Sequence, residues 1–191
     1  MSSKNVKKHG IKEVNRSVVH VGRLHFQICP WAHNPELWNG NNSASVVDSP
    51  HVDFLRLRIK EGKKTALKTL NKTRYCRMYE YWDEVRYGGG NRIPSYIKKK
   101  AKSLFDLFDS IRKKGFDNRS RIKVLKKPLW ISRGLSGGDH LQSPEIFHGH
   151  HRVACLYVLG IKQVDVDMCK DTLSGSLSWP QKLSRMKQYE G

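Results

Sequence analysis

The chain has 191 residues and a mass of 22.1 kDa, a size typical of one domain. It carries 36 Lys and Arg against 17 Asp and Glu, a formal net charge of +19, while hydrophobic residues make up 38%. This apolar fraction argues against a wholly disordered chain, and no apolar run reaches the roughly 18 residues of a transmembrane helix. The basic N-terminus, Met1–Glu13, has no apolar stretch after it, so we expect no secretory signal.

The charge also bears on partners. A sequence pI near 10.0 predicts a polyanionic partner, such as nucleic acid, nucleotide phosphates or an anionic surface. A solvated, lysine-rich surface is the alternative. The four cysteines, Cys29, Cys76, Cys155 and Cys169, lie far apart and form no CxxC pair. They therefore predict no disulfide framework, and we expect a cytoplasmic location.

The N-terminal half divides into segments of different composition. Residues 1–16 are polar and basic and predict a loose arm. Residues 17–94 form an N-terminal extension, which starts with a β-branched stretch, Ser17–Ile28, that predicts a strand or hairpin. Cys29–Pro50 contains three prolines and an Asn-Gly step, so we expect a long loop. In His51–Leu70, apolar residues at helical spacing predict a helix that breaks near its single glycine.

Aromatic and basic side chains alternate in Asn71–Val85. The aromatic residues are Tyr75, Tyr79, Tyr81 and Trp82. Such interleaving is typical of surfaces that stack nucleic-acid bases. We favour the alternative of a buried aromatic face beside exposed charges. The following segment, Arg86–Arg92, contains three consecutive glycines and predicts a flexible turn, but no GK[ST] follows and it matches no phosphate loop.

Residues 95–170 alternate between helix and strand patterns and predict the core of the domain. Apolar residues recur every three or four positions from Ile97 to Ile111, so we expect an amphipathic helix that ends before Gly115. The other predicted elements are strands at Ile122–Leu125 and Leu129–Ser132, a loop at Arg133–Ser143, a strand at Glu145–His148, a helix at His150–Leu159 and a strand at Val164–Met168. Residues 171–191 predict a peripheral tail. This order predicts an α/β (α+β mixed) fold in a single domain.

The densest cluster of reactive side chains is Phe147–Arg152 (FHGHHR), at a predicted strand–turn–helix junction. Free N–H groups and the helix dipole favour an anion at a helix start, and Gly149 lets the backbone approach a ligand closely. His150, His151 and Arg152 fall in the first helical turn, where cations are unfavourable unless an anion binds. We therefore expect these residues to bind phosphate groups. A chance basic turn is the alternative.

Zinc binding and thiol chemistry are two further alternatives for this region. Cys155 follows His151 by four residues, and His148 and His150 are close in sequence. However, consecutive histidines on a helix point about 100° apart, and neither HExxH nor CxxC accompanies them. We therefore predict no zinc site and assign no metal ligand among these residues. Cys155 falls in an apolar run, which is typical of a core residue rather than a nucleophile.

The stretch Ile146–Ala154 (IFHGHHRVA) is followed by Leu159–Val166 (LGIKQVDV). These residues resemble the ParB/sulfiredoxin superfamily in the order strand, Gly-x-His-Arg turn, helix, Leu-Gly and closing strand. The helix containing Phe105–Ile111 and the pair of strands after it fit the same layout. The resemblance covers about residues 95–170, under half of the chain.

The resemblance implies a small sheet with packed helices that binds a nucleoside triphosphate, together with Mg²⁺, at this turn. Sulfiredoxins bind ATP there and phosphorylate a sulfinic acid, relatives phosphorylate free serine, and ParB proteins bind CTP and clamp DNA. Gly149, His151 and Arg152 correspond to the phosphate-contacting positions of the family, and His150 fills the variable one.

Three departures from the family narrow the expectation. His150 stands where sulfiredoxins have a cysteine, so we do not expect repair of sulfinic acids. His148 replaces an acid that many members carry before the glycine. Only about twenty residues follow Met168, so the helix-turn-helix domain of ParB proteins is not expected.

The leading hypothesis is an intracellular nucleotide-binding protein, a phosphotransferase or NTPase that uses ATP or another NTP with Mg²⁺. His151, as a catalytic residue, and Arg152 would neutralise phosphate charge. A carboxylate should hold the metal or orient the acceptor, and we select Glu80 in the aromatic segment. The other candidates are Asp48, Asp53, Asp83, Glu84, Asp139 and Glu145.

The alternative hypothesis is a basic nucleic-acid-binding module or ParB-like nuclease that contacts backbone phosphates without sequence specificity. A basic stripe continuous with the aromatic segment would favour this alternative, and scattered basic residues would favour the enzyme. The phosphate acceptor, the nucleotide base and the oligomeric state are left open by the sequence.

Overall fold

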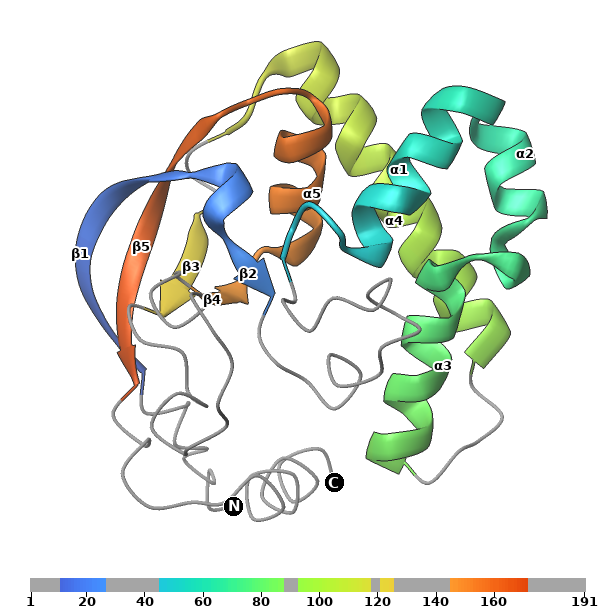
Figure 1. Cartoon of the computed structure of the whole chain (residues 1–191), viewed down its shortest axis with the longest axis horizontal. Helices are drawn as coiled ribbons and strands as arrows, with labels where there is room; N and C mark the ends of the chain where they lie inside the picture. Colours follow the sequence, from blue (N-terminus) through green and yellow to red (C-terminus); the bar gives the residue numbers. More distant parts are fainter. Residues whose placement is uncertain (1–10, 27–44, 88–92, 118–120, 126–144, 172–191) are drawn as a thin grey trace, which may run out of the picture.

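A computed structural model of the chain describes residues 11–26, 45–87, 93–117, 121–125 and 145–171 (Figure 1). These residues form a mixed α/β fold with a single sheet. The strands are β1 (Ile11–His20), β2 (His25–Phe26), β3 (Ile122–Leu125), β4 (Glu145–His148) and β5 (Gln163–Asp171). The α-helices are α1 (Pro50–Glu61), α2 (Lys63–Lys68), α3 (Arg74–Tyr87), α4 (Ile93–Lys114) and α5 (His150–Val158). Two short 3-10 turns complete the described elements, η1 (Val21–Arg23) and η4 (Leu70–Lys72).

The five strands lie in the order β1-β5-β3-β4-β2. β1 pairs antiparallel with β5, β5 parallel with β3, β3 antiparallel with β4, and β4 parallel with β2. The sequence placed residues 1–16 in a loose arm, and this is wrong for residues 11–16, which lie in β1. The arm was predicted because these residues are polar. They nevertheless form a strand, because their backbone pairs with β5 from Ile11 opposite Asp171 to Arg16 opposite Asp167.

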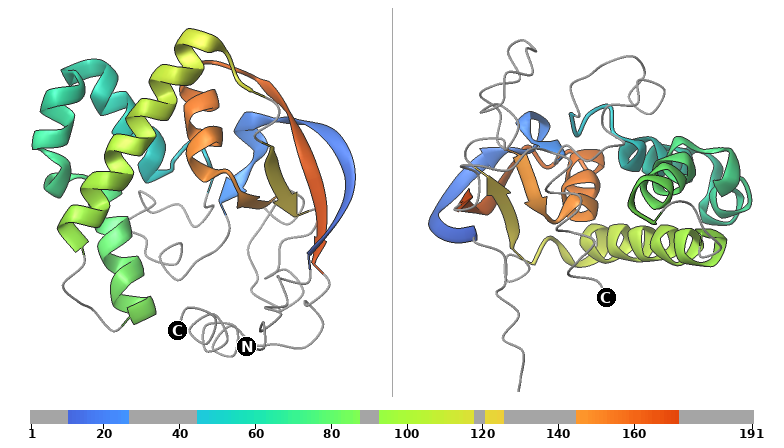
Figure 2. Two further views of the ribbon diagram at one scale, coloured as in Figure 1. Left: turned by 180° about the vertical axis from the view of Figure 1, so that it is seen from behind. Right: turned by 90° about the horizontal axis from the view of Figure 1, so that it is seen from below.

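The helices gather on one side of the sheet, and α5 lies between the sheet and the others (Figure 2). α5 packs on α1 and α4, while α3 contacts α1 and α4. α5 therefore has α1 and α4 as well as β3 and η1 against its middle turns. This explains why Val153, Ala154, Cys155 and Leu156 are each fully buried.

Local signals explain where the helices begin and end. The Ser49 hydroxyl caps α1 by accepting a hydrogen bond from the Val52 N–H, and Pro50 occupies the first helical position. Gly62, with φ of 83°, separates α1 from α2, which confirms the predicted break. The predicted amphipathic helix is confirmed as α4, and Gly115 after it has φ of 79°.

One hydrophobic cluster unites both halves of the chain. Phe54 of α1 stacks between Tyr75 of α3 and Phe105 of α4, with ring centroids 4.7 Å apart in each pair. Sheet residues such as Ile122 and Val166 belong to the same cluster. The predicted N-terminal extension (17–94) and core (95–170) thus both supply residues to this cluster, and their boundary falls inside α4.

Other predictions have different outcomes. The strands at Ile122–Leu125 and Glu145–His148 are confirmed as β3 and β4, and the last helix and strand as α5 and β5. The predicted strand at Leu129–Ser132 and loop at Arg133–Ser143 lie outside the described residues, as do most of the long loop from residue 29 and nearly all of the predicted tail. Among the helices of the described segments, none has the length and apolar character needed to cross a membrane.

Candidate functional site

The turn between β4 and α5 has the strand–glycine–helix geometry that the sequence predicts. Gly149 adopts φ of 105° and ψ of 20°, a region that L-residues with a side chain rarely occupy. A Cβ atom at Gly149 would lie 3.1 Å from Cγ1 of Ile122 in β3. Glycine is therefore required here both for its backbone conformation and for the close approach of β3.

Helix α5 begins directly after this glycine. Gly149 has no side chain to cap the helix, and its carbonyl accepts the Val153 N–H at 3.0 Å. The residues of the first turn are His150, His151 and Arg152, with no acidic residue among them. The helix dipole at this end attracts negative charge, and here Arg152 adds positive charge instead of balancing it.

Arg152 is held in place by backbone contacts. Its Nη1 donates a hydrogen bond to the carbonyl oxygen of Arg121 at 3.1 Å, just before β3. Arg121 in turn donates through Nη1 to Oδ1 of Asp167, at 3.0 Å, and Asp167 is only 2% exposed. Arg152 is half-buried, and this chain of contacts fixes the start of α5 against the sheet. The carbonyl is neutral, and no carboxylate within the described ranges pairs with the Arg152 guanidinium.

Further basic groups surround the turn. Lys123 of β3 pairs with His148 of β4, and burial, Arg152 and Lys123 together lower the pKa of His148. Lys100 of α4 contributes to the lowered pKa of His151. Among the described residues, no carboxylate forms an ion pair with Lys100, Lys123 or Arg152. The described surroundings of the turn are thus electropositive.

His151 lies in a cluster of aromatic and imidazole rings. Its Nε2 is 3.1 Å from the Tyr79 hydroxyl and 3.4 Å from the Tyr75 hydroxyl, both on α3. The ring of His51, at the start of α1, lies 5.2 Å from the ring of His151. Burial, with smaller contributions from His150, Lys100 and Arg152, lowers the pKa of His151 to about 3. His151 is therefore a neutral hydrogen-bonding group at pH 7 and carries no charge of its own.

The other histidines of this cluster are also neutral. Burial and the nearby His148 lower the pKa of His150 to about 4. Burial, followed by His151 and His150, lowers the pKa of His51 well below its ordinary value. Burial also raises the pKa of Tyr79 to about 12, so its hydroxyl stays protonated. Positive charge near the turn must therefore come from Arg152, Lys100 and Lys123.

The predicted carboxylate, Glu80, has a different neighbourhood. It is exposed on α3, where its Oε1 accepts a hydrogen bond from the Cys76 thiol at 3.4 Å. No described contact joins Glu80 to the Gly149 turn. Asp83 lies one helical turn after Tyr79 on the same face of α3, and its Oδ2 is buried without a hydrogen bond in the described part of the chain. Asp83 is thus a partly buried carboxylate one helical turn from Tyr79, and no described contact joins it to the other rings of the cluster.

The remaining carboxylate candidates are placed elsewhere. Asp53 binds Arg74 and lies near Arg56, while Asp48 and Asp53 both flank the start of α1. Asp139 lies outside the described residues, as do the side chains of Glu84 and Glu145. None of these residues has a described contact with the ring cluster.

The structure also bears on the zinc and thiol alternatives. Cys155 is buried in α5, its thiol points to the carbonyl of Leu104 at 3.9 Å, and burial raises the pKa of this thiol to about 12. A thiol with a raised pKa is a poor nucleophile and a poor metal ligand. Within the described ranges, no three His, Cys, Asp or Glu side chains are grouped so that they could hold a metal ion.

Sequence reasoning did not identify two members of the site, His51 and Lys100, as its neighbours. His51 and Lys100 belong to helices far from the turn in sequence. Asp83 was among the candidate carboxylates for the reaction, but the sequence analysis selected Glu80. The signal for His51 was its place at the start of a helix, after Ser49 and Pro50. The tertiary packing of α1, α3 and α4 around α5 was needed to join them.

Comparisons with known proteins give the site no name. No protein-family model matches the chain, and neither a curated protein nor a solved structure matches it. The fold and the geometry of the turn therefore define the class only as far as a mixed α/β protein with a basic, glycine-led helix start.

Proposed function

We propose that the turn from Gly149 to Arg152 binds the phosphates of a nucleoside triphosphate, and that the protein is a phosphotransferase or NTPase. One observation carries the proposal: α5 begins at a required glycine within an electropositive site that no described carboxylate neutralises. A phosphate supplies the missing negative charge and accepts hydrogen bonds from the N–H groups of the helix start. The resemblance of residues 95–170 to ParB/sulfiredoxin proteins points in the same direction.

The charged residues have separable roles in this proposal. The guanidinium of Arg152 gives a charge-assisted contact to phosphate oxygens, and its tie to the Arg121 carbonyl limits the side-chain entropy lost on binding. Lys100 and Lys123 approach from α4 and β3 and neutralise charge without fixed geometry. An anion binds more strongly to a cationic site that no described carboxylate neutralises than to a site whose cations already form ion pairs.

His151 has a role that differs from a charged phosphate ligand. A general base works best with a pKa near the operating pH, and a pKa of about 3 makes His151 a weak base in the protein without ligand. A bound anion would raise this pKa, because it replaces the repulsion from Lys100 and Arg152 with attraction. We therefore assign His151 to positioning the Tyr79 hydroxyl, with proton transfer possible only once phosphate is bound.

Asp83 is the carboxylate that we assign to the reaction, in place of Glu80. Its Oδ2 lacks a hydrogen bond within the described residues, so it fits a cation or the hydroxyl of an acceptor. Mg²⁺, where bound, neutralises charge on the transferred phosphoryl group, and one or two carboxylates suffice to hold it beside the phosphates. Asp83 would either hold that ion or orient the acceptor.

A binding experiment with a matched control tests the proposal. ATP, CTP, GTP and ADP, each with and without Mg²⁺, are screened by thermal shift on the full chain. A ligand at about 100 times its Kd stabilises the folded state by about 2.7 kcal/mol. Calorimetry with Arg152→Ala should then show affinity lower by about 1.5–3 kcal/mol, the worth of a charge-assisted contact.

The control is Arg112→Ala, an arginine on α4 that is 63% exposed and pairs with Asp109. This variant should bind nucleotide with the same affinity as the parent. It also removes one positive charge, but at a position outside the turn. Unchanged affinity in a folded Arg152→Ala protein, or an equal loss in both variants, would contradict the site assignment.

A second candidate function is binding of single-stranded nucleic acid, and one observation favours it. Tyr96 of α4 is 49% exposed, contacts the Tyr79 ring at 6.0 Å, and has Lys100 over its face at 5.2 Å. Lys98, Lys99 and Lys102 follow on the same helix. This α4 basic strip joins the aromatic segment, although other basic residues are spread over α1 and α2.

Fluorescence anisotropy with labelled single-stranded DNA at two salt concentrations tests this second function. Tyr96→Ala should weaken binding by about 1–3 kcal/mol if the ring stacks on a base. Affinity that falls steeply with salt but does not change in Tyr96→Ala would indicate attraction by net charge alone.

A further inference from the structure

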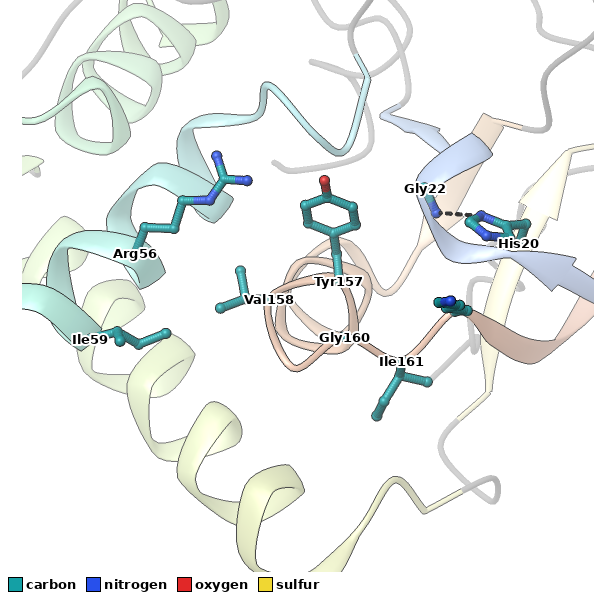
Figure 3. Close-up of a pocket in the computed structure, with 9 residues that line it drawn as sticks. His20, Gly22, Arg56, Ile59, Tyr157, Val158, Gly160 and Ile161 are labelled. Atoms are coloured by element: carbon teal, nitrogen blue, oxygen red, sulfur yellow. Dashed lines mark hydrogen bonds between the residues drawn. The ribbon is translucent and has the colours of Figure 1, made fainter.

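A groove lies at the C-terminal end of α5, at the opposite end of this helix from the Gly149 turn (Figure 3). Its volume is about 490 Å³, and it opens between α1, the end of α5 and the junction of β1 with η1. Apolar side chains line it from two elements: Ile59 from α1, and Tyr157 and Val158 from α5, with Ile161 just after the helix. The charged side chains at its edge are Arg56 and Lys162.

A second, smaller groove of about 220 Å³ continues on the other side of Ile161. Val18 of β1, Phe116 after α4, and Gln163, Val164 and Asp165 of β5 line it. Val18 is 60% exposed and Ile59 is 57% exposed, and they are two of the three large hydrophobic residues that are exposed in the described part of the chain. We call the larger hollow the α5 C-terminal groove, because the smaller one carries the carboxylate of Asp165.

The backbone that shapes this groove is already fixed. Gly160, with φ of 74°, ends α5 in a Schellman motif, in which the Ile161 N–H reaches the Leu156 carbonyl and the Gly160 N–H the Tyr157 carbonyl, each at 3.0 Å. The Val21 N–H donates to the Lys162 carbonyl at 2.8 Å and ties η1 to the same loop. A partner would therefore meet a preformed surface and would not have to order it.

The charges of the larger groove are all of one sign. Arg56 and Lys162 line it, and no carboxylate does so among the described residues. Arg56 is 4.0 Å from Asp53, but Asp53 also binds Arg74 more closely, so the guanidinium of Arg56 keeps most of its capacity for another anion. This guanidinium also lies 5.9 Å from the centre of the Tyr157 ring, next to the apolar floor.

The apolar floor and the basic edge of the groove favour one kind of binding partner over others. A second copy of the chain, docked face to face, would bring Arg56 and Lys162 against the same basic residues, in a protein of net charge +19. A nucleic acid backbone would leave the apolar floor unfilled. We propose that the α5 C-terminal groove binds a short acidic segment of another protein, which places apolar side chains on Ile59, Val158 and Ile161 and carboxylates on Arg56 and Lys162.

This docking surface is independent of the proposed nucleotide site. The two sites share α5 but none of their lining residues, because the helix buries its middle and presents different residues at its two ends. Failure of either proposal would leave the other standing.

A displayed library of random 12-residue peptides, selected on the full chain, tests the proposal. Selected peptides should be enriched in Asp and Glu alternating with Leu, Ile or Phe. Their synthetic forms should bind Ile59→Ser and Arg56→Gln at least tenfold more weakly than the parent. Both substituted side chains are exposed, at 57% for Ile59 and 55% for Arg56, so the variants should fold. The matched control is Lys60→Gln, which removes one charge from the same helix outside the groove.

Four results would overturn the proposal. The first two are that the selected peptides lack the acidic and apolar pattern, or that they bind the parent, Ile59→Ser and Arg56→Gln equally well. An equal loss in Lys60→Gln would show attraction by net charge only. Finally, vesicles containing phosphatidylserine that bind the parent, and release Ile59→Ser and Arg56→Gln but not Lys60→Gln, would show that the groove faces a membrane instead of a peptide.

Discussion

The two ends of α5 differ in the polarity and exposure of the side chains that surround them. At its start, neutral histidines and tyrosines are buried among basic residues, and the backbone turns through a glycine pressed against Ile122. At its end, a Schellman motif leaves apolar side chains in water beside Arg56 and Lys162. One short helix can therefore contribute to a proposed anion site at its start and to a proposed peptide-binding groove at its end. The two sites lie on separate surfaces because the middle of the helix is buried in the core.

The largest effect should come from Asp83 of α3, the carboxylate that we assign to the reaction. If the site at the start of α5 carries out phosphoryl transfer, Asp83→Asn should lower nucleotide turnover by about 100-fold or more, the usual range for an acid–base or positioning group. It should also change the Mg²⁺ dependence of ATP binding in calorimetry. Glu80→Gln serves as the matched control on the same helix and should stay within about twofold of the parent, because Glu80 is exposed and bound to Cys76. The reverse pattern would restore Glu80 as the functional acid.

The two glycines that flank α5 give a direct comparison in stability. Gly149→Ala should destabilise the protein by about 2–4 kcal/mol, from backbone strain at φ of 105° and from crowding against Ile122 at 3.1 Å. Gly160→Ala should cost only about 1 kcal/mol, because φ of 74° is strained but nothing lies within 4 Å of the added Cβ. Urea unfolding measures both free energies, and equal costs would show that the contact with Ile122 is not tight.

The buried histidines should make the start of α5 sensitive to acid. His151 has a pKa of about 3 in the folded protein, below its ordinary value of 6.5, so the unfolded chain binds the proton more readily. The stability due to its neutral form is complete above pH 6.5 and falls by about 1.4 kcal/mol per pH unit as the pH drops toward 3. His151→Gln should therefore flatten the loss of stability between pH 6.5 and pH 4.5 by about 2–3 kcal/mol. Identical slopes for the variant and the parent in urea titrations would contradict a buried neutral His151.

The smallest effect should be at the C-terminal end. Ile59→Ser should change the free energy of unfolding by no more than about 0.5 kcal/mol, since the side chain is 57% exposed and contributes little to the core. A large loss of stability would mean that Ile59 is covered in the folded protein. The groove would then be part of the interior instead of a docking surface.

The sequence by itself determined the local elements of this protein. Helical spacing from Ile97 to Ile111 predicted most of α4, and alternation from Val164 to Met168 predicted β5, because both periods follow from backbone geometry. The glycine in FHGHHR predicted the turn at Gly149 for the same local reason. The arm predicted over residues 1–16 was wrong for residues 11–16. A polar strand has no hydrophobic pattern in its own sequence, and it is identified only by its pairing with β5.

Only the tertiary structure decided which of these residues share a site. It surrounded His151 with Tyr75, Tyr79 and His51 from two other helices, and burial there removed the positive charge that the sequence assigned to His151. It also separated Glu80 from Asp83, because residues three apart on α3 have different exposure once one face packs. Protonation and proximity depend on contacts between distant segments, and a pattern of neighbouring residues does not contain them.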